Sequence, residues 1–579
     1  MALAERKPLV TGLILGGVHA LLLGLAFAPF DLWGLTLLAV VPLGVLAWET
    51  PRPARAALGA ALASIPMWAF HHQWIAKVSP VGFPVLILYL AVWPGLFVWL
   101  AARVHRRRRA WPAWAIVPVL WTGLEVLRGE VIWHGYPWYL LSHPTADLLW
   151  LSTVGGIIGA YGVGTIVATF AGILVQAWAT RRRELVDVQR TDWLRRIALP
   201  VVAVTLIVGM LVMTTSRPAT PPPTVRVAVV QTNVPQDNRQ SWSDDERVRD
   251  FLSFLEMTAQ AADPADGAIP DVIVWPETMF AGSTLSVEAV ATERAAGLGI
   301  TQFHDRLVSD QRRLGVPMIV GAIGLDGLHV SNTPEGIEYR FDARFNSAFV
   351  VRGGAVDPNR YDKLHLTPFG EVMPYISAWP WLEQRLLALG AGGMTFDLEA
   401  GRRPVVLEVP LNSGESERTI LRVATPICFE ATMPAVCRQL VAPGGQRAAD
   451  LMVNLTNDGW FAWFDASRRN HLLAARWRCI ELGTPMVRAA NTGISCAIGG
   501  DGRIITIEDG SGRRPASLSA RTAGTLTVDV PLPDERTTIY ARHGHRWGWI
   551  VMMGAGVMAL SGMVPQPRKG QPGPTTRDA

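Results

Sequence analysis

Residues 424–430 read Ala-Thr-Pro-Ile-Cys-Phe-Glu, and this stretch places a cysteine at the end of an apolar run that begins at Leu421. In α/β folds, ligands and reactive groups gather at the carboxyl ends of the strands. A cysteine at such a place is still more often a packing residue than a nucleophile. Cys428 alone therefore carries only a weak prediction of catalysis.

Two other strand ends strengthen the prediction that Cys428 is catalytic. Residues 272–278, Val-Ile-Val-Trp-Pro-Glu-Thr, deliver Glu277 after a buried run, and residues 361–371 carry Lys363 and, eight positions later, Glu371. A thiol is only a few per cent thiolate at neutral pH, so it needs a base for its proton and a cation for the oxyanion. Singly, Glu277 could cap a helix, and Lys363 and Glu371 could form a surface ion pair.

Around these positions the sequence alternates short β-branched runs with helical stretches, which predicts an α/β domain. The expected strands are 224–230, 271–275, 317–322, 347–351, 421–427, 451–455 and 494–498. The expected helices are 244–262, 292–314 and 467–482.

The composition indicates that this domain belongs to a membrane protein. Of the 579 residues, 50% are hydrophobic and only 17% are charged, whereas soluble domains carry about 25% charged residues. By segment, the net charge is +8 over residues 1–216, −6 over 217–545 and +3 over 546–579. The overall pI near 9.2 thus reflects two basic apolar ends, and no nucleic-acid partner is expected.

A membrane span needs about 20 mostly apolar residues. Eight candidates lie near 9–28, 32–48, 57–75, 82–102, 112–127, 148–178, 197–214 and 547–564. Every second connecting loop is rich in Lys or Arg, and such loops stay cytoplasmic. We therefore expect a membrane domain over 1–216, an extracytoplasmic catalytic domain over 217–545, a last span over 546–564 and a disordered tail over 565–579. Both termini are expected in the cytoplasm.

The four cysteines, Cys428, Cys437, Cys479 and Cys496, all fall in the middle segment. An even number in an oxidising compartment allows a disulfide, and the sequence leaves that possibility open. Their spacing matches no zinc pattern.

The motifs resemble the carbon-nitrogen hydrolase, or nitrilase, superfamily. They are Trp-Pro-Glu-Thr at 275–278, the run from Lys363 to Pro-Phe-Gly-Glu at 368–371, Cys-Phe-Glu at 428–430, Asn-Asp-Gly-Trp-Phe at 457–461 and Arg-Ala-Ala-Asn-Thr-Gly at 488–493. The resemblance implies a four-layer αββα sandwich. Such a domain between the seventh and eighth of eight spans is similar to the apolipoprotein N-acyltransferase family.

This resemblance implies a role for each motif residue. Cys428 would be the nucleophile, Glu277 the general base, Lys363 the oxyanion stabiliser and Glu371 a supporting carboxylate. Two more, Glu430 and Trp242, match positions near the family's active-site entrance, and Phe429 stands where the family commonly has Tyr.

The resemblance also implies a reaction and its partners. A phospholipid, of the phosphatidylethanolamine kind, would donate an acyl chain to Cys428, and the amine of a diacylglyceryl apolipoprotein would accept it. This reaction needs no metal and no other cofactor. The enzyme would be a monomer of the bacterial inner membrane, with its catalytic domain in the periplasm. We expect Trp133, Tyr136 and Trp138 either to line the lipid interface or to form a generic aromatic belt, and loops 369–370 and 460–464 to gate the site.

Two rival functions remain open from the sequence. A membrane-anchored amidase would use the same three groups with water as second nucleophile, although one span would suffice to anchor it. A transporter or scaffold with an inactive domain is disfavoured because Glu277, Lys363, Glu371 and Cys428 are all present.

Overall fold

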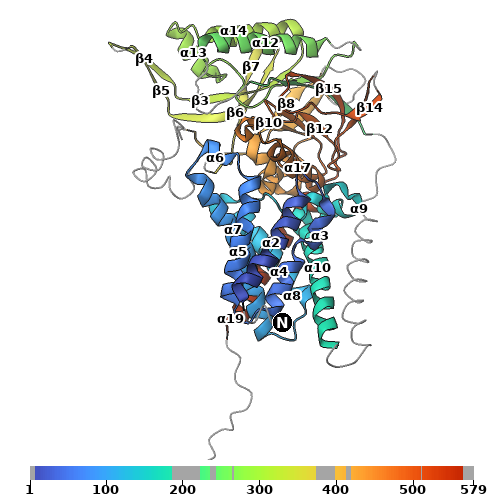
Figure 1. Ribbon diagram of the computed structural model, residues 1–579. Helices are drawn as coiled ribbons and strands as arrows, with labels where there is room; N and C mark the ends of the chain where they lie inside the picture. The colour runs from blue at the N-terminus through green and yellow to red at the C-terminus, as the bar shows by residue number, and fades with distance from the viewer. Residues whose placement is uncertain are drawn as a thin grey trace, which may run out of the picture.

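The computed structural model describes residues 7–184, 222–234, 243–263, 267–334, 336–368, 370–372, 398–411, 419–509 and 512–564. A body of helices is built from both ends of the chain, and an α/β body built from the middle rests on one end of it (Figure 1). The two bodies share one continuous cluster of buried hydrophobic side chains.

The helical body begins with the N-terminal elements. They are α2 (Pro8–Ala26), η1 (Trp33–Leu35), α3 (Thr36–Ala39), α4 (Val41–Glu49), α5 (Pro53–His71), α6 (Ile75–Val78), α7 (Gly82–Arg107), α8 (Ala113–Val126), η2 (Leu127–Val131), η3 (Ile132–His134), η4 (His143–Asp147), α9 (Leu149–Ser152) and α10 (Gly155–Glu184). The C-terminal helix α19 (Arg546–Met563) completes it. A Cβ on Gly123 would lie 2.3 Å from the Ala555 Cβ, so α19 packs directly on α8.

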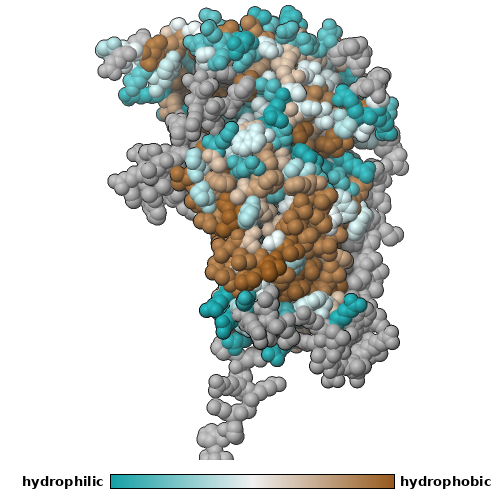
Figure 2. Space-filling view, viewed as in Figure 1, coloured by the Kyte–Doolittle hydropathy of each residue, from teal (hydrophilic) through white to brown (hydrophobic). Residues whose placement is uncertain are grey.

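Helices occupy every predicted span except 197–214, which lies outside the described residues. Three of them, over Pro8–Ala26, Gly82–Arg107 and Gly155–Arg181, are long and apolar enough to cross a membrane. Figure 2 shows a hydrophobic belt over the helical body, with hydrophilic residues at its far end and over the α/β body. The structure therefore has the surface of a membrane protein.

Small residues let the first helices approach closely. A Cβ on Gly12 of α2 would lie 2.4 Å from the Ala56 carbonyl oxygen, and one on Gly59 of α5 would lie 2.4 Å from the Leu9 carbonyl oxygen. The α2 and α5 backbones are thus in direct contact, as is common where helices pack within a membrane.

Two sheets form the α/β body. The six-stranded sheet has the order β15-β1-β2-β3-β6-β7, and the five-stranded sheet has the order β12-β11-β10-β9-β8. The strands are β1 (Thr224–Gln231), β2 (Val272–Val274), β3 (Met318–Asp326), β6 (Ala343–Arg352), β7 (Ala355–Asp362), β8 (Val406–Pro410), β9 (Ile420–Ala424), β10 (Leu451–Thr456), β11 (Met486–Ala490), β12 (Cys496–Ile498) and β15 (Gly524–Pro531). Two hairpins lie outside them, β4 (His329–Thr333) with β5 (Gly336–Arg340) and β13 (Thr506–Asp509) with β14 (Gly512–Pro515).

The period-two alternation of strand side chains makes this a sandwich. In β1, Val227 and Val229 join the cluster between the sheets, while Ala228 and Val230 join a second cluster under the outer helices. The outer helices are α12 (Asp244–Ala262), α13 (Val287–Ala295) and α14 (Thr301–Leu314). On the other side lie η5 (Cys428–Thr432), α16 (Pro434–Val441), η6 (Pro443–Gly445), η7 (Asp458–Phe461), α17 (Asp465–Leu482) and α18 (Ile539–His543). The result is the nitrilase-like αββα arrangement.

One predicted helix is wrong in extent. The stretch 292–314 is two helices, because Gly297 adopts a positive φ of 71° between α13 and α14. A backbone in that conformation cannot continue a right-handed helix.

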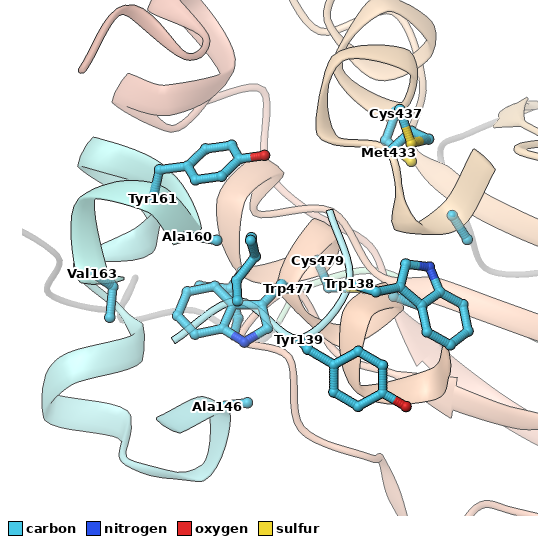
Figure 3. Packing of buried hydrophobic residues seen from close by; sticks show 14 of the residues in the cluster. Trp138, Tyr139, Ala146, Ala160, Tyr161, Val163, Met433, Cys437, Trp477 and Cys479 are labelled. Atoms are coloured by element: carbon cyan, nitrogen blue, oxygen red, sulfur yellow. The ribbon is translucent and has the colours of Figure 1, made fainter. Parts of the chain in front are cut away.

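Helix α17 joins the α/β body to the helical body. Its Trp477 donates from Nε1 to the His143 carbonyl oxygen at 3.1 Å, and its Asn470 accepts from the Ala28 N–H at 3.3 Å. Figure 3 shows Trp477 and Cys479 beside Trp138 and Tyr139, which come from the segment before η4. Most of α17 is therefore buried.

The contact between α2 and α5 gives a direct test of the helical body. We expect Gly12→Leu to lower the unfolding free energy by roughly 1–3 kcal/mol, because the new side chain must push the α5 backbone away. The matched control is Gly17→Leu on the same helix, where a Cβ meets nothing within 4 Å. Thermal unfolding of the purified chain in detergent measures both, and equal effects would contradict the packing described.

Candidate active site

The three predicted strand ends meet at one place between the sheets. Glu277 follows β2, Lys363 follows β7, and Cys428 follows β9 and opens η5. Together with Glu371 they line a cavity of about 260 Å³. Residues that are 65 to 151 positions apart in sequence thus share one site, because the strands that they follow end at the same edge of the two sheets.

Lys363 lies between two carboxylates. Its Nζ is 2.6 Å from Glu371 Oε2 and 3.6 Å from Glu277 Oε1, and the lysine side chain is fully buried. Charges removed from water must be paired and hydrogen-bonded to be tolerated. This cluster meets that condition, because Lys363 also donates to Thr367 Oγ1 at 3.3 Å and the Thr367 N–H donates to Glu371 at 2.8 Å.

Glu277 is held by two donors that the sequence analysis did not single out for this role. Asn346 of β6 donates from Nδ2 to Glu277 Oε1 at 2.7 Å and to Glu371 Oε1 at 3.2 Å. The Asn457 N–H donates to Glu277 Oε2 at 2.7 Å. An amide side chain within the buried part of strand β6 was the available signal for Asn346.

Electrostatics assign a resting state to the four groups. Burial, and after it Glu277, raises the pKa of the Cys428 thiol, although Lys363 acts in the opposite direction. Burial also raises the pKa of Glu277. Burial alone would lower the pKa of Lys363, but the carboxylates of Glu371 and Glu277 outweigh it and raise that pKa.

Glu371 behaves differently from Glu277. Burial opposes its charge, but Lys363 outweighs burial and lowers the pKa of Glu371 below the ordinary value. At rest the site therefore holds a thiol, an ammonium, a firmly ionised Glu371 and a Glu277 that can take up a proton. Such a set can deprotonate a thiol during attack and hold the negative charge that develops.

The walls of the cavity are apolar and come partly from the helical body. Helices α6 and α7 supply Val78, Val85, Leu86 and Tyr89 among others, and the segment after η2 supplies Trp133, Tyr136 and Trp138. Gly370, Trp460 and Phe461, from the loops predicted to gate the site, also line it. A chain of methylene groups fits such walls better than a polar substrate does.

Two further residues that the sequence predicts for the site are Phe429 and Trp242. Phe429 stacks between His365, at 6.0 Å between ring centroids, and Tyr136, at 6.5 Å. Trp242 lies outside the described residues.

Glu430 is not at the entrance. It is fully buried and accepts from the N–H groups of Ile427, Leu364 and His365 at 2.7, 2.8 and 2.9 Å and from the Tyr361 hydroxyl at 2.9 Å. Through these four donors, the Glu430 carboxylate links the segment of Cys428 to the segment of Lys363.

The cysteines and possible metal ligands can also be placed. All four cysteines are free thiols, and Cys437, Cys479 and Cys496 are buried. Within the described part of the chain, no group of three or more His, Cys, Asp or Glu side chains is arranged to hold a metal ion.

Comparisons with known proteins assign both bodies. Residues 226–540 match the family described as carbon-nitrogen hydrolase, and residues 19–173 match the apolipoprotein N-acyltransferase N-terminal domain. Curated relatives named apolipoprotein N-acyltransferase include one from Ralstonia nicotianae, 30% identical over 94% of this chain and 91% of the relative. Another, from Methylococcus capsulatus, is 28% identical over 86% of this chain and 87% of the relative.

A solved amidase from Nesterenkonia covers 58% of this chain and 98% of its own length, with 16% identity and a TM-score of 0.34.

The buried ion cluster generates a pH-dependent stability prediction. Lys363→Met keeps the bulk but leaves Glu277 and Glu371 without their cation, which should cost roughly 3–5 kcal/mol of unfolding free energy at neutral pH. In that variant, burial and mutual repulsion hold both carboxyl pKa values above their unfolded values. Protonation on acidification then relieves the repulsion, so the stability deficit should shrink as the pH falls. Thermal unfolding at several pH values tests this, and a deficit independent of pH would contradict it.

Proposed function

Because this chain belongs to the apolipoprotein N-acyltransferases of the carbon-nitrogen hydrolase family, we propose that Cys428 carries a fatty acyl chain from a phospholipid to the N-terminal amine of an apolipoprotein. One observation carries the proposal. Glu277, Lys363 and Cys428 face a cavity whose apolar walls are supplied by α6 and α7 of the helical body.

In the first half-reaction, Glu277 takes the proton from the Cys428 thiol as sulfur attacks the ester carbonyl carbon. A C–S bond forms, and the carbonyl oxygen becomes an oxyanion that Lys363 and the Phe429 N–H stabilise. One such donor typically lowers the barrier by about 2.7–4 kcal/mol. The ester C–O bond then breaks, and protonated Glu277 returns the proton to the departing lysophospholipid oxygen.

In the second half-reaction, the neutral α-amino group of the diacylglyceryl cysteine attacks the thioester carbonyl. A C–N bond forms while Glu277 accepts a proton from nitrogen, the C–S bond breaks, and the proton returns to the Cys428 sulfur. An amide is more stable than a thioester, so this step runs downhill. The two substrates use the same thiol in turn, which gives ping-pong kinetics without a metal or another cofactor.

The position of the site explains the need for the helical body. Each methylene group buried in lipid is worth about 0.8 kcal/mol, so a long acyl chain is costly to extract into water. A cavity walled by α6 and α7 can receive the chain from the bilayer directly. We place the cavity at the membrane surface, with Trp133 and Tyr136 toward the lipid interface and Trp138 buried against His471. The loops around Gly370 and at 460–464 would admit the substrates.

The full topology is part of the proposal: spans within 1–216, a periplasmic domain over 217–545, an eighth span over 546–564 and a cytoplasmic tail over 565–579. Gly562 near the end of α19 packs on Val104 near the end of α7, and Gly12 near the start of α2 packs on Ala56 near the start of α5. These ends carry Arg52, Arg106 and Arg107, which supports a cytoplasmic location. We further propose that the protein is a monomer in the bacterial inner membrane and that its acyl donor is a phosphatidylethanolamine-like phospholipid.

Transfer of a labelled sn-1 chain from phospholipid to a diacylated lipopeptide tests the function. We expect Cys428→Ala to abolish transfer by the purified chain, because it removes the acyl carrier. The matched control is Cys479→Ala, which removes another buried thiol and should retain transfer. Label released only as free fatty acid in the presence of lipopeptide would instead identify a hydrolase.

The apolar cavity leads to a second prediction, which concerns the chain length of the donor. Leu86→Trp on α7 fills part of the cavity, and excluding two methylene groups should raise the KM for long-chain donors roughly tenfold. Val92→Trp on the same helix is the control, since Val92 is 54% exposed on the belt and does not line the cavity. Initial rates with donors of graded chain length measure the effect, and identical KM values for both variants would refute the assigned cavity.

A further inference from the structure

Cys428 has an unusual backbone. Its φ is 50°, in the left-handed region that residues with a side chain rarely adopt. Such a conformation persists only where the surroundings hold it in place. The contacts that hold it are therefore informative about how the nucleophile is presented.

Two side chains hold the Cys428 carbonyl group. His471 of α17 approaches the carbonyl oxygen with Nε2 at 3.3 Å, and Asn454 of β10 approaches with Nδ2 at 3.4 Å. In a trans peptide the C=O and the following N–H point in opposite directions. Fixing the Cys428 carbonyl on the side of His471 therefore fixes the direction of the Phe429 N–H, which is the proposed oxyanion donor.

A buried arginine connects both holders. Arg488 of β11 donates from Nη1 to Asn454 Oδ1 at 2.7 Å, and its Nη2 lies 3.0 Å from His471 Nδ1. The same Nη2 is 2.7 Å from Asp458 Oδ2, and Asp458 Oδ1 is 3.0 Å from His471 Nδ1. All four residues are buried, so the arrangement is shielded from water.

The surroundings also select the protonation of His471. A carbonyl oxygen can only accept, so the proton must be on Nε2. Burial, and after it Arg488, lowers the pKa of His471, while Asp458 opposes both.

The ring plane of His471 is fixed from the helical body. Trp138 stacks on it with 5.5 Å between ring centroids and 23° between planes, and Phe461 meets it edge-on at 5.7 Å. Trp138, labelled in Figure 3, belongs to the segment before η4. An element of the helical body thus sets the orientation of a ring that contacts the nucleophile's backbone.

We propose that His471 is a positioning residue that orients the Cys428–Phe429 peptide, so that the Phe429 N–H points at the oxyanion formed during acyl transfer. The inference rests on the proposed function of Cys428 and adds a role for a side chain outside the Glu277, Lys363 and Cys428 set. It predicts that His471 matters for reactions that form an oxyanion and not for other reactions of the same thiol.

Two reactions of Cys428 in the full-length chain distinguish an effect on oxyanion formation from a general effect on the thiol. Thioester formation with labelled phospholipid passes through an oxyanion, whereas alkylation by iodoacetamide displaces iodide without one. For His471→Phe, which keeps a ring against Trp138, we expect thioester formation to slow by roughly 10- to 100-fold, somewhat less than for a lost oxyanion donor. Alkylation, corrected with Cys428→Ala for other thiols, should keep its rate.

Amide variants give the same test without an aromatic ring. His471→Gln places an amide N–H within reach of the carbonyl and should recover most of the rate of thioester formation, whereas the shorter His471→Asn should not. Equal rates for Gln and Asn, an unchanged rate for Phe, or a matching loss of alkylation would each overturn the inference. Absence of thioester on the unsubstituted chain would instead contradict the proposed function itself.

Discussion

The site depends on one buried cation shared by two carboxylates. Lys363 is fully buried, and its ammonium group lies 2.6 Å from Glu371 and 3.6 Å from Glu277. In a medium of low polarity these charges are tolerated only together, so the segments that carry them must converge. That requirement ties the ends of β2 and β7 to each other and, through Asn346, to β6. The cluster is thus both a structural link across the sheet edge and the source of the site's electrostatics.

The pKa values of the two carboxylates shift in opposite directions because of this geometry. Glu371 has the shorter contact to the ammonium group and keeps a lowered pKa, whereas burial raises the pKa of Glu277. One carboxylate therefore neutralises the cation while the other can carry a proton. The raised pKa of the Cys428 thiol fits the same division, because a thiol at rest needs a base at the moment of attack.

The helical body completes the site and is not a passive anchor. It supplies the apolar walls of the cavity, and Trp138 reaches the ring of His471. Helix α17 contacts both the site and the helical body, since His471 lies against Cys428 and Trp477 donates to His143. The apolar walls and the ionisable groups of the site thus line one continuous cavity.

Strand-end positions in the sequence suggested a shared site for Glu277, Lys363 and Cys428, because a motif that ends a buried strand has a defined place at the sheet edge. The role of Glu371 came from the family resemblance. Asn346, His471 and Arg488 received no role, since their partners lie far away in sequence and depend on strand order and helix placement. An arginine inside the fully buried strand β11 was a usable signal, because such a charge requires a partner. The break in 292–314 required knowing the backbone conformation of Gly297.

We propose that the acyl chain rests on Cys428 between donor and acceptor. Intact-protein mass spectrometry of the chain incubated with a phospholipid of defined acyl length, without acceptor, tests it most directly. We expect one added acyl group, located on the peptide containing Cys428, sensitive to hydroxylamine and removed by addition of lipopeptide. An unmodified mass under conditions in which lipopeptide is still acylated would contradict the account.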